Sequence, residues 1–237
     1  MLKAINITKK FGALSAVDDL SFEVEEGQVF GIAGPNGAGK STLYNLITGF
    51  YKFEGKIEFD GQNISGLPTH KIARLGISRT FQIPQIFESL TVEESVRLGC
   101  RFGNIGKYDP DYSDKMISFA SLKEERSNKT DLLNLLGKKR LMIAAALATK
   151  PKILMVDEPM AGLNAKEIMQ MTNLIKRINQ ELKITVIIIE HFMKVLTELA
   201  NPILVIQNGK EICTGTPEEI TSNPEVIECY LGDTHDA

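Results

Sequence analysis

The sequence predicts an α/β fold in which a phosphate-binding loop joins a buried strand to a helix. Residues 34–42 read GPNGAGKST and fit the pattern G-x-x-x-x-G-K-[ST]. Two later apolar runs, residues 152–156 and 185–189, have the near-continuous hydrophobicity of strands buried on both faces of a parallel sheet. Polar side chains follow each run directly, at the strand ends where α/β folds place their ligands.

The composition limits the class of protein. The chain has 237 residues, 43% hydrophobic and 24% charged, which suffices for the core of one large domain or of a domain with a lobe. Its net charge of -3 argues against a general nucleic-acid-binding protein. No apolar run has the length of a membrane span, and the N-terminus lacks signal-peptide features. The three cysteines, Cys100, Cys213 and Cys229, show no metal-ligand spacing, as expected for reduced thiols in a cytosolic protein.

The loop at residues 34–42 is expected to bind a polyphosphate. An apolar strand-like run leads into it, residues 28–33, and a helical run leads out, residues 41–47. Its glycines let successive N–H groups point inward, and the following helix favours anionic oxygens. Lys40 would contact the β- and γ-phosphates and the Ser41 hydroxyl would bind Mg²⁺. The expected nucleotide-binding residues are Gly34, Pro35, Asn36, Gly37, Ala38, Gly39, Lys40, Ser41 and Thr42.

The N-terminal segment predicts short strands. Residues 2–7 alternate between apolar and polar side chains, residues 22–24 form a second strand, and residues 56–59 lead into an Asp60-Gly61 hairpin turn. Phe11 lies between the first two strands and could stack on a nucleotide base through its π-face. The alternative for Phe11 is an ordinary core residue.

Further along, residues 68–75 predict a helix and residues 77–82 a strand that ends in Gln82, just before Pro84. A polar side chain at that strand end is a candidate ligand-binding residue, although a solvated loop residue is the simpler alternative. From residue 91 to 150, helical periodicity and charge replace the strand signals, which predicts an inserted helical lobe.

Within the expected lobe, residues 103–113 are rich in turn formers. Residues 123–129, KEERSNK, are interpreted as a solvated helix end. Residues 141–148 are strongly helical because they are rich in Ala and Leu.

Two acids follow the buried strand at residues 152–156. Asp157 would hold Mg²⁺ through its water shell, and Glu158 would polarise the attacking water. A solvated turn is the alternative for an isolated Asp-Glu pair, but a buried strand downstream of a phosphate loop favours the catalytic interpretation.

The C-terminal part continues the alternating pattern. Residues 165–183 predict a long amphipathic helix, and residues 185–189 a strand that delivers His191, a candidate hydrogen-bond donor to the γ-phosphate. A lone histidine is otherwise more often structural.

A hairpin and two helices are expected to end the chain. Two strands, residues 203–206 and 211–214, flank a hairpin turn, and helices begin at Pro217 and Pro224. Residues 232–237 are expected to form a loose tail.

This ordered set of motifs resembles the nucleotide-binding subunit of ABC transporters over about residues 2–232. Residues 34–42 match the Walker A loop, Gln82 the Q-loop, Asp157 and Glu158 the Walker B acid and catalytic glutamate, residues 161–164 the D-loop, His191 the switch histidine, and Phe11 the adenine-stacking aromatic. The resemblance implies a P-loop NTPase core of the ABC ATPase type, with an antiparallel β subdomain and a helical lobe at 91–150, in one domain over residues 1–237. It implies ATP and Mg²⁺ as cofactors, with Glu158, His191, Lys40 and Gln82 as catalytic residues and Ser41, Gln82 and Asp157 as metal ligands.

Finer sequence features resemble the branched-chain amino-acid importer branch. These are RTFQ at 79–82, DEPMAGLN at 157–164, EHFM at 190–193, GTPEEI at 215–220, and NPEVIE at 223–228 followed by YLG at 230–232. The resemblance implies an ATPase at the cytoplasmic face of a membrane that works with two permease subunits, a second ATPase subunit and, indirectly, a periplasmic or extracellular binding protein, without nucleic acid.

The cargo stays open, since relatives of this branch handle urea, amides and other amino acids. Alternatives are an ATPase of a lipid or lipopolysaccharide export system, a non-transport ABC protein of DNA repair or translation, and a nucleotide-binding partner that does not turn over. The sequence RTFQ at residues 79–82 argues against the export ATPase. The absence of tandem domains or long insertions argues against the non-transport protein.

One motif departs from the resemblance. The family signature LSGGQ corresponds here to residues 133–137, LNLLG. Asn134 can replace Ser at a helix start. Leu136 replaces the second glycine, and its side chain is expected to crowd a partner's phosphate, unless Gly137 takes over that role. This predicts a heterodimer with one competent and one weak site, with a homodimer as the alternative.

Overall fold

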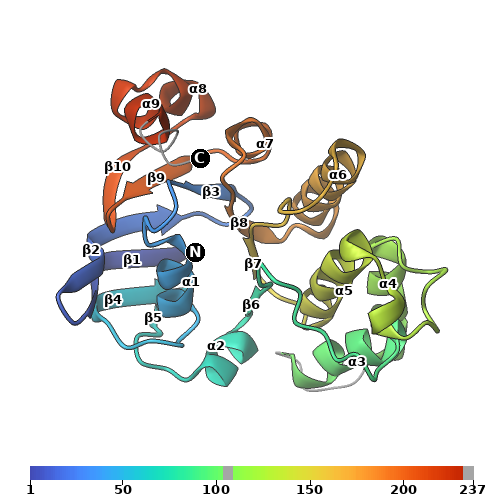
Figure 1. Cartoon of the computed structure of the whole chain (residues 1–237). Coiled ribbons are helices and arrows are strands. Elements are labelled where there is room, and N and C mark those ends of the chain that lie inside the picture. Colours follow the sequence, from blue (N-terminus) through green and yellow to red (C-terminus); the bar gives the residue numbers. More distant parts are fainter. Residues whose placement is uncertain (104–108, 232–237) are drawn as a thin grey trace. The chain divides into compact units, whose positions relative to one another are not determined.

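The chain folds into two compact units. The computed structural model describes residues 1–103 and 109–231 (Figure 1). Unit 1 comprises Met1–Ile72 and Thr185–Ala237, and unit 2 comprises Ala73–Ile184. The expected lobe, residues 91–150, falls within unit 2. The expected tail at 232–237 and part of the turn-rich stretch at 103–113 lie outside the described residues.

An antiparallel sheet in unit 1 has the strand order β2-β1-β4-β5. Its strands are β1 (Leu2–Phe11), β2 (Leu14–Val24), β4 (Glu54–Phe59) and β5 (Gln62–Asn63). The expected strands at 2–7, 22–24 and 56–59 are confirmed, and the turn at Asp60 and Gly61 has both residues at positive φ. β2 begins eight residues earlier than expected. Acidic residues are rare in strands, and β2 carries Asp18 and Asp19, the latter at φ 53°.

The parallel strands of unit 1 place the phosphate-binding loop. β3 (Val29–Ala33) pairs in parallel with β8 (Thr185–Ile189) on one side and with β9 (Ile203–Gln207) on the other. β8 is buried throughout and β3 almost so, as their apolar runs predict. β10 (Lys210–Gly215) returns antiparallel to β9 through a turn at Asn208 and Gly209, both at positive φ.

The first and the last two helices of unit 1 begin within one residue of their predicted starts, whereas the helix at Met193–Leu199 is not predicted by the sequence analysis. They are α1 (Lys40–Ile47), α7 (Met193–Leu199), α8 (Pro217–Ser222) and α9 (Pro224–Leu231), while α2 (Thr69–Leu75) crosses into unit 2. α1 is fastened to β8 because the buried Tyr44 hydroxyl donates to the Ile187 carbonyl at 2.7 Å. The N-cap Thr216 starts α8 with a reciprocal capping box to Glu219, and Pro217 occupies the first turn.

Unit 2 joins two parallel strands, β6 (Ile77–Arg79) and β7 (Ile153–Asp157), to a set of helices. These are α3 (Val92–Phe102), α4 (Pro110–Phe119), the 3₁₀ helix η1 (Thr130–Leu132), α5 (Leu135–Ala148) and α6 (Ala165–Leu182). The predicted strand at 77–82 is wrong at its end, because β6 stops at Arg79. Only the Thr80 N–H continues the ladder, donating to Met155 at 2.9 Å, and Pro84 then cannot donate to a strand partner.

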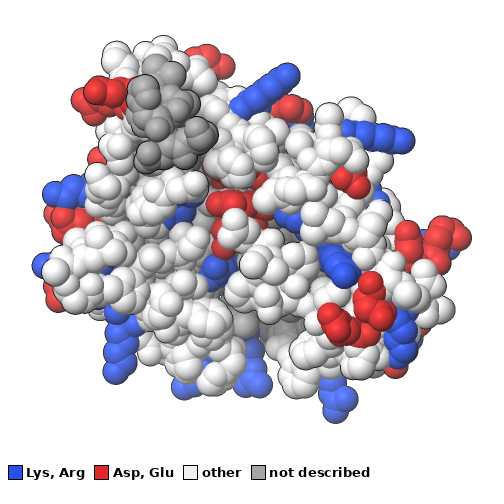
Figure 2. Space-filling view, viewed as in Figure 1, with Lys and Arg blue, Asp and Glu red and all other residues white. Residues whose placement is uncertain are grey.

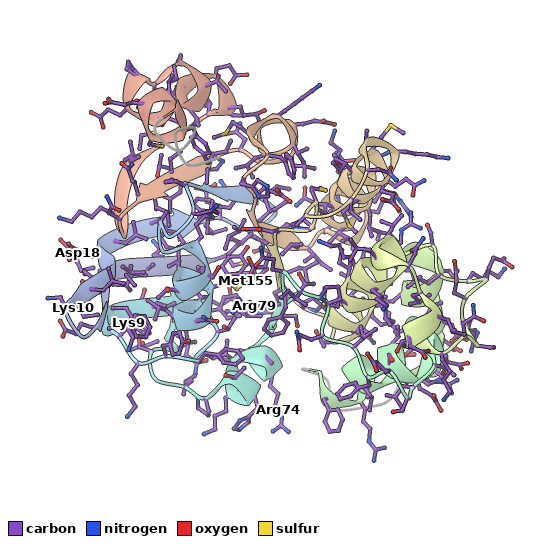
Figure 3. The ribbon with its side chains drawn as sticks, viewed as in Figure 1. Lys9, Lys10, Asp18, Arg74, Arg79 and Met155 are labelled. Carbon is purple, nitrogen blue, oxygen red and sulfur yellow. The ribbon has the colours of Figure 1, made fainter. Side chains whose placement is uncertain are left out.

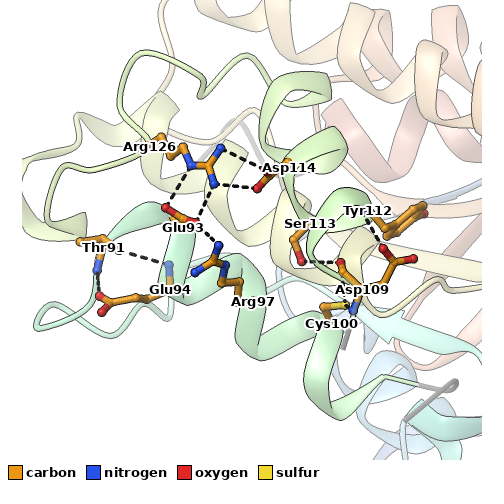
Figure 4. A network of polar contacts seen from close by, with 10 residues as sticks. All are labelled: Thr91, Glu93, Glu94, Arg97, Cys100, Asp109, Tyr112, Ser113, Asp114 and Arg126. Carbon is orange, nitrogen blue, oxygen red and sulfur yellow. Dashed lines mark hydrogen bonds and ion pairs between the residues drawn. The ribbon is translucent and has the colours of Figure 1, made fainter. Parts of the chain in front are cut away.

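The prediction of a helix end at residues 123–129 is wrong. This stretch forms turns that cross-link α3 and α4. The Arg126 guanidinium donates to Glu93 at 2.6 and 3.0 Å and to Asp114 at 3.1 Å (Figure 4). The hydrogen bond from Arg126 holds the pKa of the Glu93 carboxyl below its usual value. The charge of Arg126 therefore serves as a bridge within the lobe, whereas Lys123, Glu124 and Lys129 are exposed, as a solvated stretch predicts.

The helices α3 and α4 of the lobe each begin with a side-chain cap. Thr91 and Glu94 form a capping box at the start of α3 (Figure 4). Asp109 caps α4 by accepting from the Tyr112 N–H at 3.0 Å, and it also accepts from the Lys150 ammonium at 2.8 Å. The Lys150 hydrogen bond lowers the pKa of the Asp109 carboxyl.

Two further properties concern the surface charge and the helices. On the face shown in Figure 2, basic and acidic side chains both occur, as the small net charge predicts. Among the described residues, no helix is both long enough and apolar enough to cross a membrane.

The packing of α3 against α5 depends on Gly99. A Cβ at this position would lie 2.1 Å from the Ala145 carbonyl oxygen, inside any allowed contact. We expect Gly99→Ala to destabilise the protein by about 1–3 kcal/mol, since the helices must separate to admit the methyl group. Urea unfolding measures this change. The control is the exposed Arg101→Ala on the same helix, expected to stay within about 0.5 kcal/mol of the wild type. A Gly99→Ala variant as stable as the control would contradict the close approach.

Candidate active site

The phosphate-binding loop in unit 1 has the backbone shape that its glycines predict. Gly34, Gly37 and Gly39 have φ values of 146°, 77° and 107°, which side chains disfavour. A Cβ at Gly34 would lie 2.1 Å from the Ile206 carbonyl oxygen, and one at Gly39 would lie 2.2 Å from that of Ala16. Gly39 is also the N-cap of α1 and makes no side-chain cap, so the first N–H groups of α1 remain directed at the loop.

Lys40 curls back over the loop. Its ammonium donates to the carbonyl of Gly34 at 2.6 Å and to that of Pro35 at 2.9 Å, and the residue is only 6% exposed. Ser41, the next residue, is exposed. The loop thus holds one buried positive charge beside a helix start, an arrangement suited to an anionic phosphate chain.

Phe11, at the end of β1, belongs to an exposed aromatic cluster. It is 43% exposed, which argues against an ordinary core residue. Its ring lies edge-on to Tyr51 at 5.3 Å between centroids, and the Lys9 ammonium lies 4.9 Å from its centroid. Figure 3 shows Lys9 and Lys10 at this part of β1. Tyr51 has no sequence signal of its own, so the sequence analysis missed it.

His191 follows β8 and has a side chain that is 43% exposed. Its ring packs against Phe192 at 4.3 Å between centroids. The preceding Glu190 is fully buried, and its carboxylate accepts from the N–H groups of His191 and Phe192 at 3.2 and 3.5 Å. Glu190 therefore holds the turn that presents His191.

In unit 2, Asp157 is the last residue of β7 and is 5% exposed. Its carboxylate accepts from the Arg79 guanidinium at 2.9 Å, and the Arg79 side chain is itself 8% exposed. Figure 3 shows Arg79 and Met155 on the paired strands β6 and β7. The acid expected to hold Mg²⁺ is thus held in place by a buried ion pair that the sequence analysis did not anticipate.

Glu158 has a backbone conformation that non-glycine residues rarely adopt. Its φ is 42°, a kind of strain that is common at functional sites. The ammonium of Lys139, a residue of α5 that is 3% exposed, donates to the Glu158 carbonyl at 3.1 Å. The Gln82 amide donates to the Glu158 carboxylate at 2.6 Å. Unit 2 therefore brings together Gln82 and Glu158, two of the predicted catalytic residues.

The segment at 133–137 is the start of α5. Asn134 is its N-cap and accepts from the Gly137 N–H at 2.8 Å, which confirms that Asn can replace Ser at this helix start. Leu136 is 6% exposed and Leu135 is 39% exposed. The burial of Leu136 within unit 2 argues against the expected steric crowding of a partner's phosphate by this side chain.

Gly137, the glycine that could take over the missing role, lies in the first turn of α5. It is buried, and a Cβ there would lie 3.2 Å from both Leu133 and Asn134. The nearby D-loop segment lies against the same helix start, because a Cβ at Gly162 would come within 2.9 Å of Leu135. Asn164 caps α6 through a capping box with Glu167, as an Asp at this position also could.

Comparison with known proteins identifies the class. The family model described as ABC transporter matches residues 17–161, and the model described as branched-chain amino acid ATP-binding cassette transporter matches residues 210–236. The chain belongs to the ABC transporter family. It is an ATPase of the class that couples ATP hydrolysis to transport, and its fold is that of the family's ATP-binding cassettes, as the motifs predict.

Particular relatives lie in one branch. The chain is 38% identical to the high-affinity branched-chain amino acid transport ATP-binding protein BraF of Pseudomonas aeruginosa and 34% identical to LivG of Escherichia coli, over 98% of each chain. An ATP-binding cassette solved in its ADP conformation matches with a TM-score of 0.87 and 33% identity, over 98% of each chain. A dimeric bacterial ABC transporter cassette matches with a TM-score of 0.82 and 25% identity, over 92% of this chain and 99% of that one.

Lys40→Ala tests the phosphate-binding loop. The variant deletes the one charge held in the loop, and hydrogen bonds to charged groups contribute about 1.5–3 kcal/mol each, so we expect ATP affinity to fall by about 10- to 100-fold. Titration with a fluorescent ATP analogue measures it, and ATP should also raise the Tm of the wild type but not of the variant. Lys3→Ala, which removes an exposed ion pair of β1, is the control. Equal affinity in both variants would remove Lys40 from this role.

Proposed function

We propose that the chain is the ATP-hydrolysing subunit of an importer for branched-chain or closely related amino acids, located at the cytoplasmic face of a membrane. The observation that carries this proposal is the similarity to ATPases of this branch over essentially their whole length. The match of residues 210–236 to the branched-chain family model supports it independently of the Walker motifs, because it lies outside them.

The roles of the site residues follow from their chemistry. Lys40 and the loop N–H groups of residues 34–42 would bind the β- and γ-phosphates, and Phe11 would stack on the adenine. His191 would donate to the γ-phosphate, and Gln82 would sense it. Glu158 would orient and polarise the attacking water. Most of the rate enhancement would come from position and fixed charge, since phosphoryl transfer needs little covalent chemistry from the protein.

The residues assigned to Mg²⁺ fit that ion. Mg²⁺ prefers oxygen ligands, keeps several waters and takes only one or two protein ligands beside the phosphates. The Ser41 hydroxyl, the Asp157 carboxylate and the Gln82 amide oxygen are ligands of this kind. Bound Mg²⁺ would neutralise charge on the phosphate oxygens. The ion pair with Arg79 keeps the Asp157 carboxylate in one orientation before any metal contact.

Contacts with two membrane permease subunits would use apolar side chains of unit 2. Ile83, Phe87 and Phe102 are 71%, 65% and 66% exposed. Exposed apolar surface that gathers into a large patch marks protein interaction sites, and these side chains are candidates for such a patch. We propose that a permease segment covers them, and that an extracellular or periplasmic binding protein delivers cargo to those permeases.

A second ATPase subunit would complete the assembly. In a head-to-tail pair, the start of α5 in one chain would face the nucleotide of the other, and a solved relative is dimeric. The burial of Leu136 removes the steric argument for one weak site, so a heterodimer now rests on the resemblance to the branched-chain importers. The altered segment at 133–137 keeps a second candidate open, a nucleotide-binding partner with little turnover of its own.

Glu158→Gln separates binding from hydrolysis. The amide cannot act as a carboxylate toward water, so we expect ATP affinity close to that of the wild type and turnover reduced by about 100-fold or more. ATP-dependent dimers should then accumulate, and size-exclusion chromatography should show them as an earlier peak. The control is Glu198→Gln, an exposed acid of α7. Hydrolysis at the wild-type rate would mean that another group positions the water.

Reconstitution tests the proposed transport. The chain is reconstituted in vesicles with the ATPase and the permeases that neighbouring genes encode. ATP-dependent uptake is then compared for leucine, isoleucine, valine, urea and amides. Uptake of branched-chain amino acids supports the proposal, and uptake of none of these compounds contradicts it.

The same preparation tests the asymmetric pair. We expect little turnover from this chain alone and about tenfold or more with its partner, because a neighbouring chain supplies electrostatic contacts to the γ-phosphate. Fast hydrolysis by the isolated chain that is insensitive to Asn134→Ala and Leu135→Arg would contradict the pair.

A further inference from the structure

We propose that Tyr230 is a positioning residue of the phosphate-binding loop, through which the C-terminal helix α9 sets nucleotide affinity. The Gly34 N–H donates to the Tyr230 hydroxyl oxygen at 2.8 Å, across 196 residues of sequence. The inference rests on the nucleotide site proposed for residues 34–42.

Gly34 needs an acceptor at this point of the chain. β3 makes its last pairing with β9 at Ala33 and Val205, so the N–H of Gly34 lies just past the ladder. Gly34 is buried, and a buried backbone donor without a partner is costly. Tyr230 supplies that partner where the sheet no longer does.

The residue that Tyr230 contacts also contacts the positive charge of the site, the Lys40 ammonium. The Gly34 N–H donates to Tyr230, while its carbonyl accepts from the Lys40 ammonium at 2.6 Å. There is no room for Gly34 to shift toward β9, because a Cβ there would lie 2.1 Å from the Ile206 carbonyl oxygen. Tyr230 thus restrains the peptide that enters the loop, and the carbonyl on the other side of the Gly34 Cα accepts from Lys40.

α9 presents the hydroxyl from a firm position. Val226 and Cys229 are 3% and 7% exposed, and Tyr230 follows at the spacing that places all three on one helix face. Asn223 fixes the start of α9 by accepting from the Glu225 N–H at 2.8 Å. The opposite face is turned outward, since Ile227 is 45% exposed. A helix docked in this way can transmit a change in its own position to the loop.

The segment that carries Tyr230 belongs to the branch rather than to the core motifs. Residues 210–236 match the branched-chain family model, whereas the general ABC transporter model ends at residue 161. The Tyr230 contact therefore links a branch-specific C-terminal segment to the loop shared by the whole class.

Tyr230→Phe is the decisive variant, since it keeps the ring and deletes the hydroxyl that accepts from Gly34. Without the restraint, the loop would occupy its binding-competent shape for a smaller fraction of time, and the apparent Kd for ATP rises in inverse proportion to that fraction. We expect the Kd and KM for ATP to rise by about threefold to tenfold, with kcat changed less than twofold. The amide of Gly34 should also exchange its hydrogen faster.

Tyr44→Phe is the matched control. It too removes one tyrosine hydroxyl bonded to the backbone of unit 1, but the partner is the Ile187 carbonyl in β8. This variant should lower the Tm while leaving the exchange of Gly34 and the Kd for ATP near their wild-type values. Measurements use the full chain, with a fluorescent ATP analogue and with hydrogen exchange read by mass spectrometry.

The outcomes are distinct. Unchanged affinity and unchanged Gly34 exchange in Tyr230→Phe would overturn the proposal, as would equal losses of affinity in Tyr44→Phe, which would indicate general destabilisation. Lys40→Ala identifies the other failure. If Lys40→Ala binds ATP normally, the nucleotide site itself is misplaced; if it loses affinity while Tyr230→Phe does not, only the role of Tyr230 is wrong.

Discussion

The close approach of neighbouring backbone to the phosphate-binding loop is the constraint on which unit 1 depends. Gly34 lies against the Ile206 carbonyl of β9, and Gly39 lies against the Ala16 carbonyl of β2. The turn at Gly209 completes this support, since its N–H donates to Ala38 and its carbonyl accepts from the Asp18 N–H, both at 2.9 Å. The loop therefore takes its shape from backbone contacts with two sheets, and its own side chains are left for the ligand. Only residues without a Cβ fit at such contacts.

In unit 2, by contrast, side chains that are far away in the sequence hold Asp157 and Glu158 in place. Arg79 holds the Asp157 carboxylate, Lys139 holds the Glu158 carbonyl, and Gln82 holds the Glu158 carboxylate. A buried ion pair contributes little net stability, because desolvation offsets its attraction. The value of the Arg79–Asp157 pair lies in orientation. Lys139 adds a link between α5, whose start faces a partner chain in the proposed dimer, and the backbone of the proposed catalytic glutamate.

Much of this could be predicted from sequence because it is local. The loop glycines, the buried runs at 152–156 and 185–189 and the caps of α8 follow from neighbouring residues alone. The contacts of Arg79, Lys139 and Tyr230 could not, since each depends on which residues the topology brings together over long separations. The strand at 77–82 was extended too far because its apolar pattern outlasts its pairing with β7. The bridge of Arg126 could not be predicted either, because its partners Asp114 and Glu93 lie on α4 and α3.

The helical periodicity of α5 predicts the burial of Leu136, whereas comparison with the signature motif does not. Leu136, Ile143 and Leu147 share one stripe of α5 at spacings of seven and four residues, and all three are buried. A position read only as a missing glycine was therefore part of the core. What α5 leaves exposed at its start is Asn134 and Leu135. The Asn134 side-chain oxygen accepts from Gly137, so its NH₂ group is left as a donor. An amide donor at a helix N-terminus suits a phosphate oxygen, as the hydroxyl of the usual serine does. In the proposed dimer, the altered signature would therefore still offer a hydrogen-bond donor to the partner's nucleotide, and Leu135 is the exposed side chain beside it.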